Sequence, residues 1–126
     1  MLNENQKYLE AISYYDRTLD KVEYIMKTNL NPFNVGSMNY FLASNLLKKG
    51  NSYYYFKEYS EAIINYNRAI QINPEDAHLY FNRGLAYAKL QNTEGAFNDF
   101  DRAAKIDPEF TKAIDNREII RQNLKK

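Results

Sequence analysis

Few side chains of this sequence could perform catalysis or bind a metal ion. Histidine occurs once, at His78, and cysteine is absent, which excludes a multi-histidine metal site and a thiolate nucleophile. Asp99 and Asp101 point to different sides of a predicted helix, and Glu58 and Glu61 form an ordinary exposed pair. A glycine-rich phosphate loop is also absent. The sequence therefore predicts a protein that is not an enzyme and binds no metal or cofactor.

The composition is that of one small globular domain. The 126 residues include 17 Lys and Arg against 16 Asp and Glu, and this net charge of +1 does not favour nucleic-acid binding. No apolar run approaches the ~18 residues of a membrane span, and residues 1–7 lack the apolar stretch of a signal peptide. We therefore expect a cytoplasmic protein that binds neither membranes nor nucleic acid.

The chain repeats itself with a period of 34 residues, the spacing between Gly50 and Gly84. The same shift brings small residues onto small ones, aromatic residues onto aromatic ones and proline onto proline. The matching pairs are Tyr53 and Tyr87, Ala62 and Ala96, Tyr66 and Phe100, Ala69 and Ala103, and Pro74 and Pro108. Two copies of one structural unit are therefore expected.

Each copy is predicted to be a helical hairpin. Apolar residues follow helical spacing over 43–57 and 77–90, and again in the second half of each copy, after a short polar break. Asn73 and Asp107 are suitable N-caps, so Pro74 and Pro108 are expected to begin the next helix. A glycine inside a helix costs about 1 kcal/mol relative to alanine. Its recurrence suggests that a neighbouring helix passes too close for a Cβ atom.

The order of glycine, aromatic, alanine, aromatic, alanine and proline resembles the tetratricopeptide repeat. The residues are Gly50, Tyr53, Ala62, Tyr66, Ala69 and Pro74 in one copy, and Gly84, Tyr87, Ala96, Phe100, Ala103 and Pro108 in the other. This resemblance implies an all-α solenoid of helical hairpins, in which the first helices line a concave groove that binds a protein or peptide.

One subgroup of this family binds the C-terminal carboxylate of a chaperone tail through a clamp of basic and amide side chains. The resemblance places Asn51, Asn82 and Lys112 at clamp positions, and Lys89 resembles a further groove lysine. The groove would have apolar walls, formed by Tyr54, Tyr55, Phe81 and Leu85. His78 would face the same groove as a solvated side chain.

Two positions depart from the clamp pattern. Leu47 stands where the subgroup has a lysine, and Asn116 stands where it has an arginine. Both changes remove a cation, and charge-assisted hydrogen bonds to a carboxylate are stronger than neutral ones. We expect the incomplete clamp to bind an acidic tail more weakly.

The two ends are less regular than the repeats at 37–74 and 75–108. Residues 8–19 match the second helix of a repeat at an offset of 51, within a predicted helix over 6–29 that a loop over 31–36 follows. This helix of the N-terminal segment, 1–36, covers the first repeat, packs against a second copy of the chain or lies in the groove. At the other end, 109–126 is predicted to be a capping helix, because Glu118 occupies the position of the next glycine.

The sequence leaves two functions open. One is an adaptor that binds an extended, acidic C-terminal peptide of a partner, like a chaperone tail. The other is a scaffold that self-associates through its N-terminal helix into a homo-oligomer.

Overall fold

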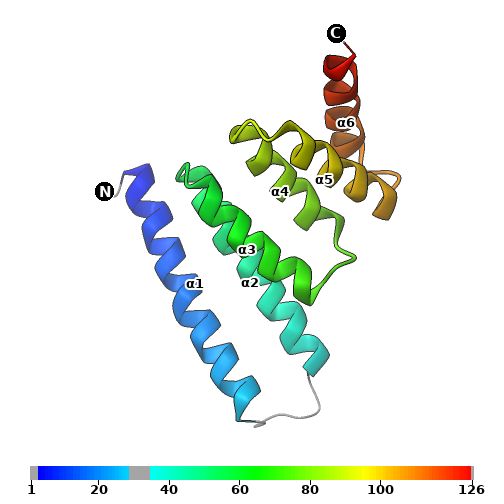
Figure 1. Ribbon diagram of the computed structural model, residues 1–126. Coiled ribbons are helices and arrows are strands. Elements are labelled where there is room, and N and C mark those ends of the chain that lie inside the picture. Colours follow the sequence, from blue (N-terminus) through cyan, green and yellow to red (C-terminus); the bar gives the residue numbers. More distant parts are fainter. Residues whose placement is uncertain (1–2, 29–34, 126) are drawn as a thin grey trace. The chain divides into compact units, whose positions relative to one another are not determined.

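The computed structural model describes residues 3–28 and 35–125. These residues form six α-helices and no strand, which confirms the predicted all-α fold (Figure 1). The helices are α1 (Glu4–Lys27), α2 (Val35–Tyr55), α3 (Tyr59–Ile72), α4 (Ala77–Lys89), α5 (Thr93–Ile106) and α6 (Thr111–Leu124). They fall into two compact units, Met1–Pro74 and Glu75–Lys126. Over the described part of the chain, none of the helices has both the length and the apolar character of a membrane span.

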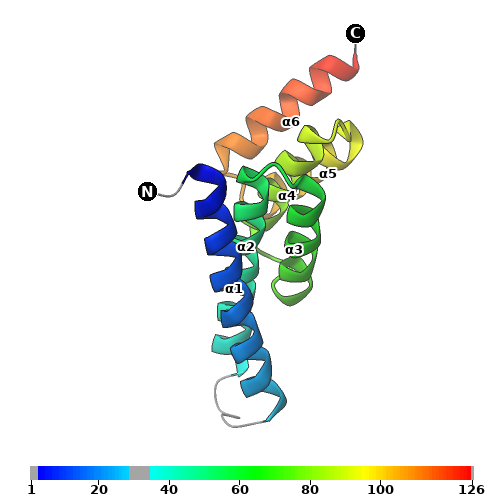
Figure 2. The ribbon, with the colours of Figure 1, turned by 90° about the vertical axis from the view of Figure 1, so that its left-hand side faces the viewer.

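In the first unit, α1 and α3 both pack against α2. Figure 2 shows α1 running beside α2 along most of its length. The apolar side of α1 is buried there through Ile12, Leu19 and Val22. Of the three placements that the sequence left open for this helix, the structure has the first, in which α1 covers the first repeat.

The ion pairs of α1 confirm its likeness to the second helix of a repeat. Lys49, Arg83 and Arg117 follow one another at the 34-residue period. Asp16 on α1 forms an ion pair with Lys49 on α2, and Asp101 on α5 forms one with Arg117 on α6. α1 therefore contacts α2 through the register that α5 uses to contact α6.

The helix α2 begins earlier than the sequence predicted. It starts at Val35 and not near residue 43, so Val35 and Gly36 are helical and do not belong to the expected loop, of which 31–34 lie outside the described residues. The prediction was wrong because residues 40–43 are four consecutive apolar residues, which show no helical period in the sequence. In the structure, Leu42 and Ala43 are buried, whereas Tyr40 and Phe41 are exposed. The first turns of α2 and the last turns of α1 extend past the end of α3 (Figure 1).

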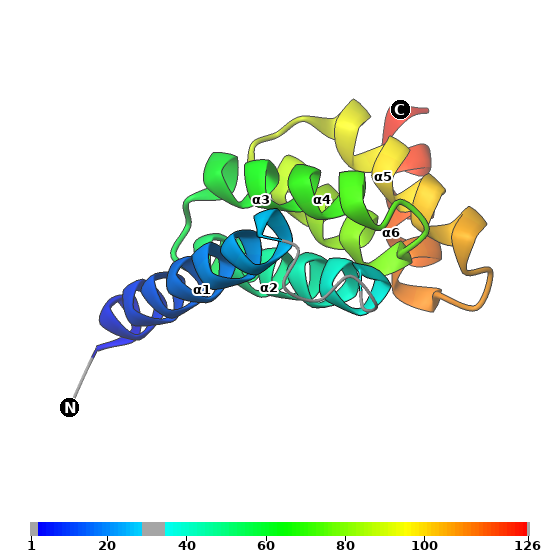
Figure 3. The ribbon, with the colours of Figure 1, turned by 90° about the horizontal axis from the view of Figure 1, so that it is seen from below.

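In the second unit, α5 packs against α4 on one side and α6 on the other (Figure 3). Ala96, Phe100, Ala103 and Ala104 of α5 are buried, as is Ala113 of α6. The helix α6 therefore covers α5, in agreement with a capping role. Ile119 is 58% exposed and therefore does not share the buried side of α6.

The prolines do not begin the next helix, and the prediction that they do was wrong. Asn73 and Asp107 are the C-caps of α3 and α5, and both have non-helical backbone angles, as expected for a residue before proline. The next helix starts three residues later, where the carboxylate of Asp76 caps α4 by accepting from the His78 backbone N–H at 3.0 Å. Proline therefore acts in both repeats by ending the preceding helix.

The two glycines that recur at the 34-residue period, Gly50 and Gly84, lie where an aromatic ring of the next helix touches the backbone. A Cβ atom added to Gly50 would lie 2.6 Å from Cε1 of Tyr66, and one added to Gly84 would lie 2.8 Å from Cε1 of Phe100. Both rings are almost completely buried, at 1% and 2% exposure. The expected close approach of a neighbouring helix is confirmed in both repeats.

This close approach predicts that Gly50→Ala and Gly84→Ala destabilise the protein. Inserting a methyl group into a tightly packed contact costs about 1–3 kcal/mol, which exceeds the gain of about 1 kcal/mol in helix propensity. Urea unfolding measures the change. Gly36→Ala is the matched control, because a Cβ atom there meets nothing within 4 Å and should leave stability unchanged or slightly raised. Equal stability of the Gly36 and Gly50 variants would contradict the packing account.

Candidate functional site

The residues predicted to bind a ligand lie on α2, α4 and α6. The helices α2 and α4 are the first helices of the two hairpins, and α6 is the capping helix. Asn51 of α2 is half-buried, and its Oδ1 accepts a hydrogen bond of 2.6 Å from the hydroxyl of Tyr66. Burial raises the pKa of Tyr66, so its hydroxyl stays protonated and donates. The bond holds the Asn51 oxygen toward α3 and thereby sets the direction of its amide nitrogen, the donor that a carboxylate would need.

The second repeat has an apolar version of the same contact. At the 34-residue spacing, Leu85 takes the position of Asn51 and Phe100 that of Tyr66. The hydroxyl and its acceptor are thus present together in one repeat and absent together in the other. Tyr66 is therefore a positioning partner for Asn51, which the sequence pattern did not reveal.

Two expected wall residues of α2 belong to a cluster of tyrosines. The ring of Tyr55 stacks on Tyr8 of α1 at 5.9 Å between centroids and lies edge-on to Tyr54 at 5.4 Å. Tyr54 also contacts Tyr59 of α3. Tyr55 stays 61% exposed, so part of its ring faces solvent next to α1.

The helix α4 carries four of the expected binding residues. Phe81, Asn82 and Leu85 are half-buried, and Lys89 is exposed in the last turn. The ring of Phe81 lies 4.9 Å from that of Phe110, the residue just before α6. The exposed His78 also contacts Phe110, at 4.9 Å between ring centroids.

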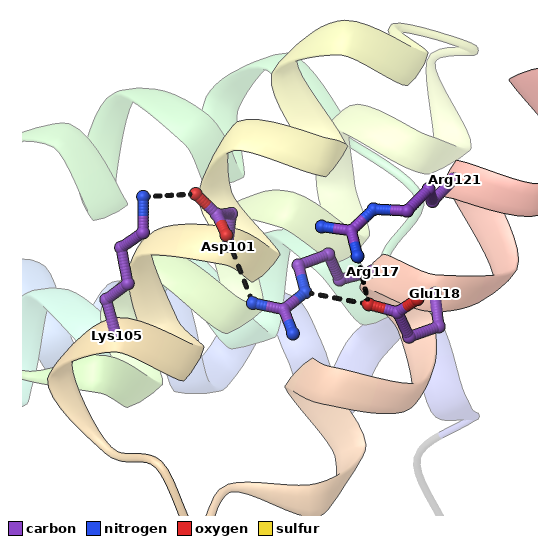
Figure 4. A network of polar contacts seen from close by, with 5 residues as sticks. All are labelled: Asp101, Lys105, Arg117, Glu118 and Arg121. Carbon is purple, nitrogen blue, oxygen red and sulfur yellow. Dashed lines mark hydrogen bonds and ion pairs between the residues drawn. The ribbon is translucent and has the colours of Figure 1, made fainter.

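The helix α6 places the two remaining residues differently. Lys112 is exposed, and Asn116 is half-buried at the position where the clamp has an arginine. Arg117, the next residue, does not replace that arginine, because its Nη1 lies 3.1 Å from the Asp101 carboxylate and its Nε 3.3 Å from Glu118. Figure 4 shows this network, which Lys105 and Arg121 complete.

The acidic residues of α5 that could have been catalytic are engaged in ion pairs. Arg83 donates two hydrogen bonds to the Asp99 carboxylate, of 2.8 and 2.7 Å. Burial raises the pKa of Asp99. Lys105 and Arg117 hold the pKa of Asp101 below its ordinary value. Across residues 3–28 and 35–125, no group of three or more acidic or histidine side chains is placed to hold a metal ion.

In the first unit, Asn51, Tyr54 and Tyr55 lie on the same helix, α2. A meeting of the predicted α4 residues with Lys112 and Asn116 of α6 stays a prediction. A single groove that runs across both repeats stays a prediction. The sequence reading also missed the exposed aromatic residues Tyr40 and Phe41, which are 70% and 48% exposed. The signal that could have found them was the run of helix-compatible residues before position 43.

The Asn51–Tyr66 pair predicts non-additive stability changes. Tyr66→Phe and Asn51→Leu should each lower stability by about 1 kcal/mol, because each leaves one partner of a partly buried hydrogen bond without the other. The double variant copies the Leu85–Phe100 contact and should lose less than the sum of the two single changes. Chemical denaturation of the four proteins measures this coupling. Strictly additive losses would show that the hydroxyl and the amide act independently.

The low pKa of Asp101 predicts a loss of stability in acid. The folded protein binds fewer protons at this carboxylate than the unfolded chain, so its contribution is full above the ordinary pKa near 3.8 and disappears as the pH falls through the lower folded value. Asp101→Asn should remove this part of the pH dependence and lower stability at neutral pH by up to about 1 kcal/mol. Thermal unfolding against pH measures both effects, and an unchanged pH profile in the variant would contradict the assignment.

Comparison with known proteins identifies the repeats. Two family models match, one described as TPR repeat over residues 50–91 and one as Tetratricopeptide repeat over residues 77–110. A curated relative is the Hsp70-Hsp90 organizing protein of Triticum aestivum, 41% identical over 71 residues that cover 56% of this chain and 12% of that protein. The chain thus spans only a small part of this relative's length.

Solved structures match over a larger share of their length. The second TPR of Spaghetti (RPAP3) bound to the HSP90 peptide SRMEEVD is 33% identical, with a TM-score of 0.63 over 65% of this chain and 76% of that one. The Arabidopsis OM64 TPR domain is 31% identical, with a TM-score of 0.65 over 68% and 71%. The first TPR of Spaghetti, 24% identical, shares the fold over 98% of this chain with a TM-score of 0.64. The chain belongs to the tetratricopeptide repeat family, a family of protein-interaction modules.

Proposed function

We propose that this chain is a non-catalytic module that binds an extended, acidic C-terminal peptide of a partner protein, such as a chaperone tail. The observation that carries the proposal is the distribution of charge. No Asp or Glu occurs between residues 24 and 57 or between 77 and 93, so α2 and α4 contain no acidic side chain. The same helices carry the exposed cations Lys48 and Lys89. An acidic peptide would meet no like charge on either helix.

The donors on these helices suit a carboxylate. Asn51, Asn82 and Lys112 lie at the clamp positions, and amide and ammonium groups donate to carboxylate oxygens. The peptide SRMEEVD bound by the second TPR of Spaghetti, a structure 33% identical to this chain, is itself acidic and gives a concrete ligand to test. Leu47 and Asn116 supply no cation, and two lost charge-assisted bonds at about 1.5 kcal/mol each correspond to roughly a hundredfold weaker binding.

The alternative of a self-associating scaffold has less support. It depended on an apolar face of the N-terminal helix that a second copy could cover. Ile12, Leu19 and Val22 of that helix are instead buried within the chain itself, where α1 packs against α2. The cytoplasmic location expected from the sequence stays a prediction.

Titration of labelled SRMEEVD, followed by fluorescence anisotropy, tests the proposed function. We expect saturable binding of the free acid and clearly weaker binding of the C-terminal amide. Asn82→Ala and Lys112→Ala should each weaken binding by about 1–3 kcal/mol, because each removes a donor to a charged acceptor. Lys125→Ala removes the same charge from the other end of α6 and should have no effect. Equal affinity for acid and amide would exclude recognition of the carboxylate.

A further inference from the structure

One face of α2 carries an apolar and cationic surface, which we name the α2 stripe. It consists of Phe41, Ser44, Leu47, Lys48 and Asn51, each of which lies three or four residues from at least one other member, so that they share a side of the helix. The stripe spans eleven residues, or roughly 15 Å of helix. All five residues are exposed or half-buried.

The contacts of α2 show why this side stays uncovered within the first unit. Lys49 points toward Asp16 of α1, and Gly50 faces the ring of Tyr66 on α3. Those two directions are occupied by helices of the same unit. The stripe lies on the remaining side, where Phe41 keeps 48% of its surface exposed.

The chemistry of the α2 stripe combines large apolar groups with one positive charge. Phe41 and Leu47 supply the apolar surface. Lys48 is exposed, and no ion pair joins it to any residue in the described ranges. Since α2 contains no acidic residue, the stripe has an uncompensated positive charge. Two copies of the chain meeting through this surface would bring like charges together, which disfavours a second copy as the occupant.

We propose that the α2 stripe binds a large apolar side chain of the peptide ligand, flanked by a carboxylate that Lys48 attracts. The proposal rests on the proposed function and adds a specificity to it: an apolar residue within an acidic segment. Leu47 is the specificity-determining residue. It replaces a cation of the clamp by an aliphatic group, so the first helix selects its ligand through an apolar contact in addition to the charge of Lys48.

Burial of an aliphatic side chain between Phe41 and Leu47 should give a measurable preference. Burying a leucine-sized group contributes enough free energy for an affinity gain of about tenfold or more. Lys48 adds affinity for a neighbouring acidic residue, and this part should decline as salt is raised. The preference for the apolar residue should persist at high salt, because it does not depend on charge.

A peptide scan tests the α2 stripe. The probes are short peptides of glutamate and serine with a free C-terminal carboxylate, either without leucine or with one leucine placed at each position in turn. We expect at least one leucine peptide to bind about tenfold tighter than the leucine-free parent. Phe41→Ser and Leu47→Ser should abolish this advantage, so that the leucine peptides and the leucine-free parent bind each variant with equal affinity.

Two further variants complete the design. Leu47→Lys should bind the parent more tightly and lose the preference for leucine, because it exchanges an apolar contact for a charged one. Ile64→Ser is the matched control, since Ile64 is an apolar residue of α3 with a similar exposure of 51%, and it should retain the preference. Circular dichroism checks that each variant is folded.

The outcomes separate the two proposals. If the parent binds but leucine gives no advantage at any position, the apolar role of the α2 stripe is overturned and the proposed function stands. If the advantage survives in both Phe41→Ser and Leu47→Ser, the stripe is not where the apolar residue binds. If no peptide binds at all, the proposed function fails and this inference fails with it.

Discussion

The contact between a backbone and an aromatic ring governs the arrangement of both hairpins. Where the rings of Tyr66 and Phe100 lie over Gly50 and Gly84, the two helices of a repeat come closer than a Cβ atom at the glycine position would allow. This contact fixes which side of the first helix faces its partner, and so fixes which residues point away from it. Asn51 and Leu85, the residues directly after these glycines, are placed by the same contact. The candidate binding surface is therefore a consequence of packing as much as of its own residues.

The two ends of the chain reuse a single ion-pair register. Asp16 meets Lys49 across α1 and α2, and Asp101 meets Arg117 across α5 and α6. The N-terminal helix thus takes the role of a preceding second helix, although its connection to α2 is longer than that between α5 and α6. An ion pair of this kind contributes little stability by itself. Its value lies in holding the terminal helix at a defined position along its neighbour.

The sequence was most informative where geometry demands one residue type. Gly50, Ala62 and Pro74 recur at a fixed period because close packing and chain reversal tolerate few alternatives, so the repeats, the helices and the close approach could all be predicted. The start of α2 could not, because its first turns carry the exposed aromatic residues Tyr40 and Phe41. The role assigned to Pro74 was wrong because a proline is compatible both with starting a helix and with ending the preceding one.

The candidate site was predicted less completely than the fold. Positions such as Asn51, Asn82 and Lys112 could be read from the family pattern, but their partners depend on which side chains meet in space. The hydrogen bonds from the Tyr66 hydroxyl to Asn51 and from Arg117 to the Asp101 carboxylate join residues that lie 15 and 16 positions apart in sequence and on different helices. Their residue types alone did not distinguish such pairs from solvated polar groups.

The central claim is that the first helix of each hairpin presents the binding surface. Amide chemical-shift mapping of the isotopically labelled chain, titrated with an acidic peptide, tests it most directly. The account predicts that the shifted resonances concentrate on α2, α4 and α6, around Asn51, Asn82 and Lys112. Perturbations confined to the exposed surfaces of α1, α3 or α5 would contradict it.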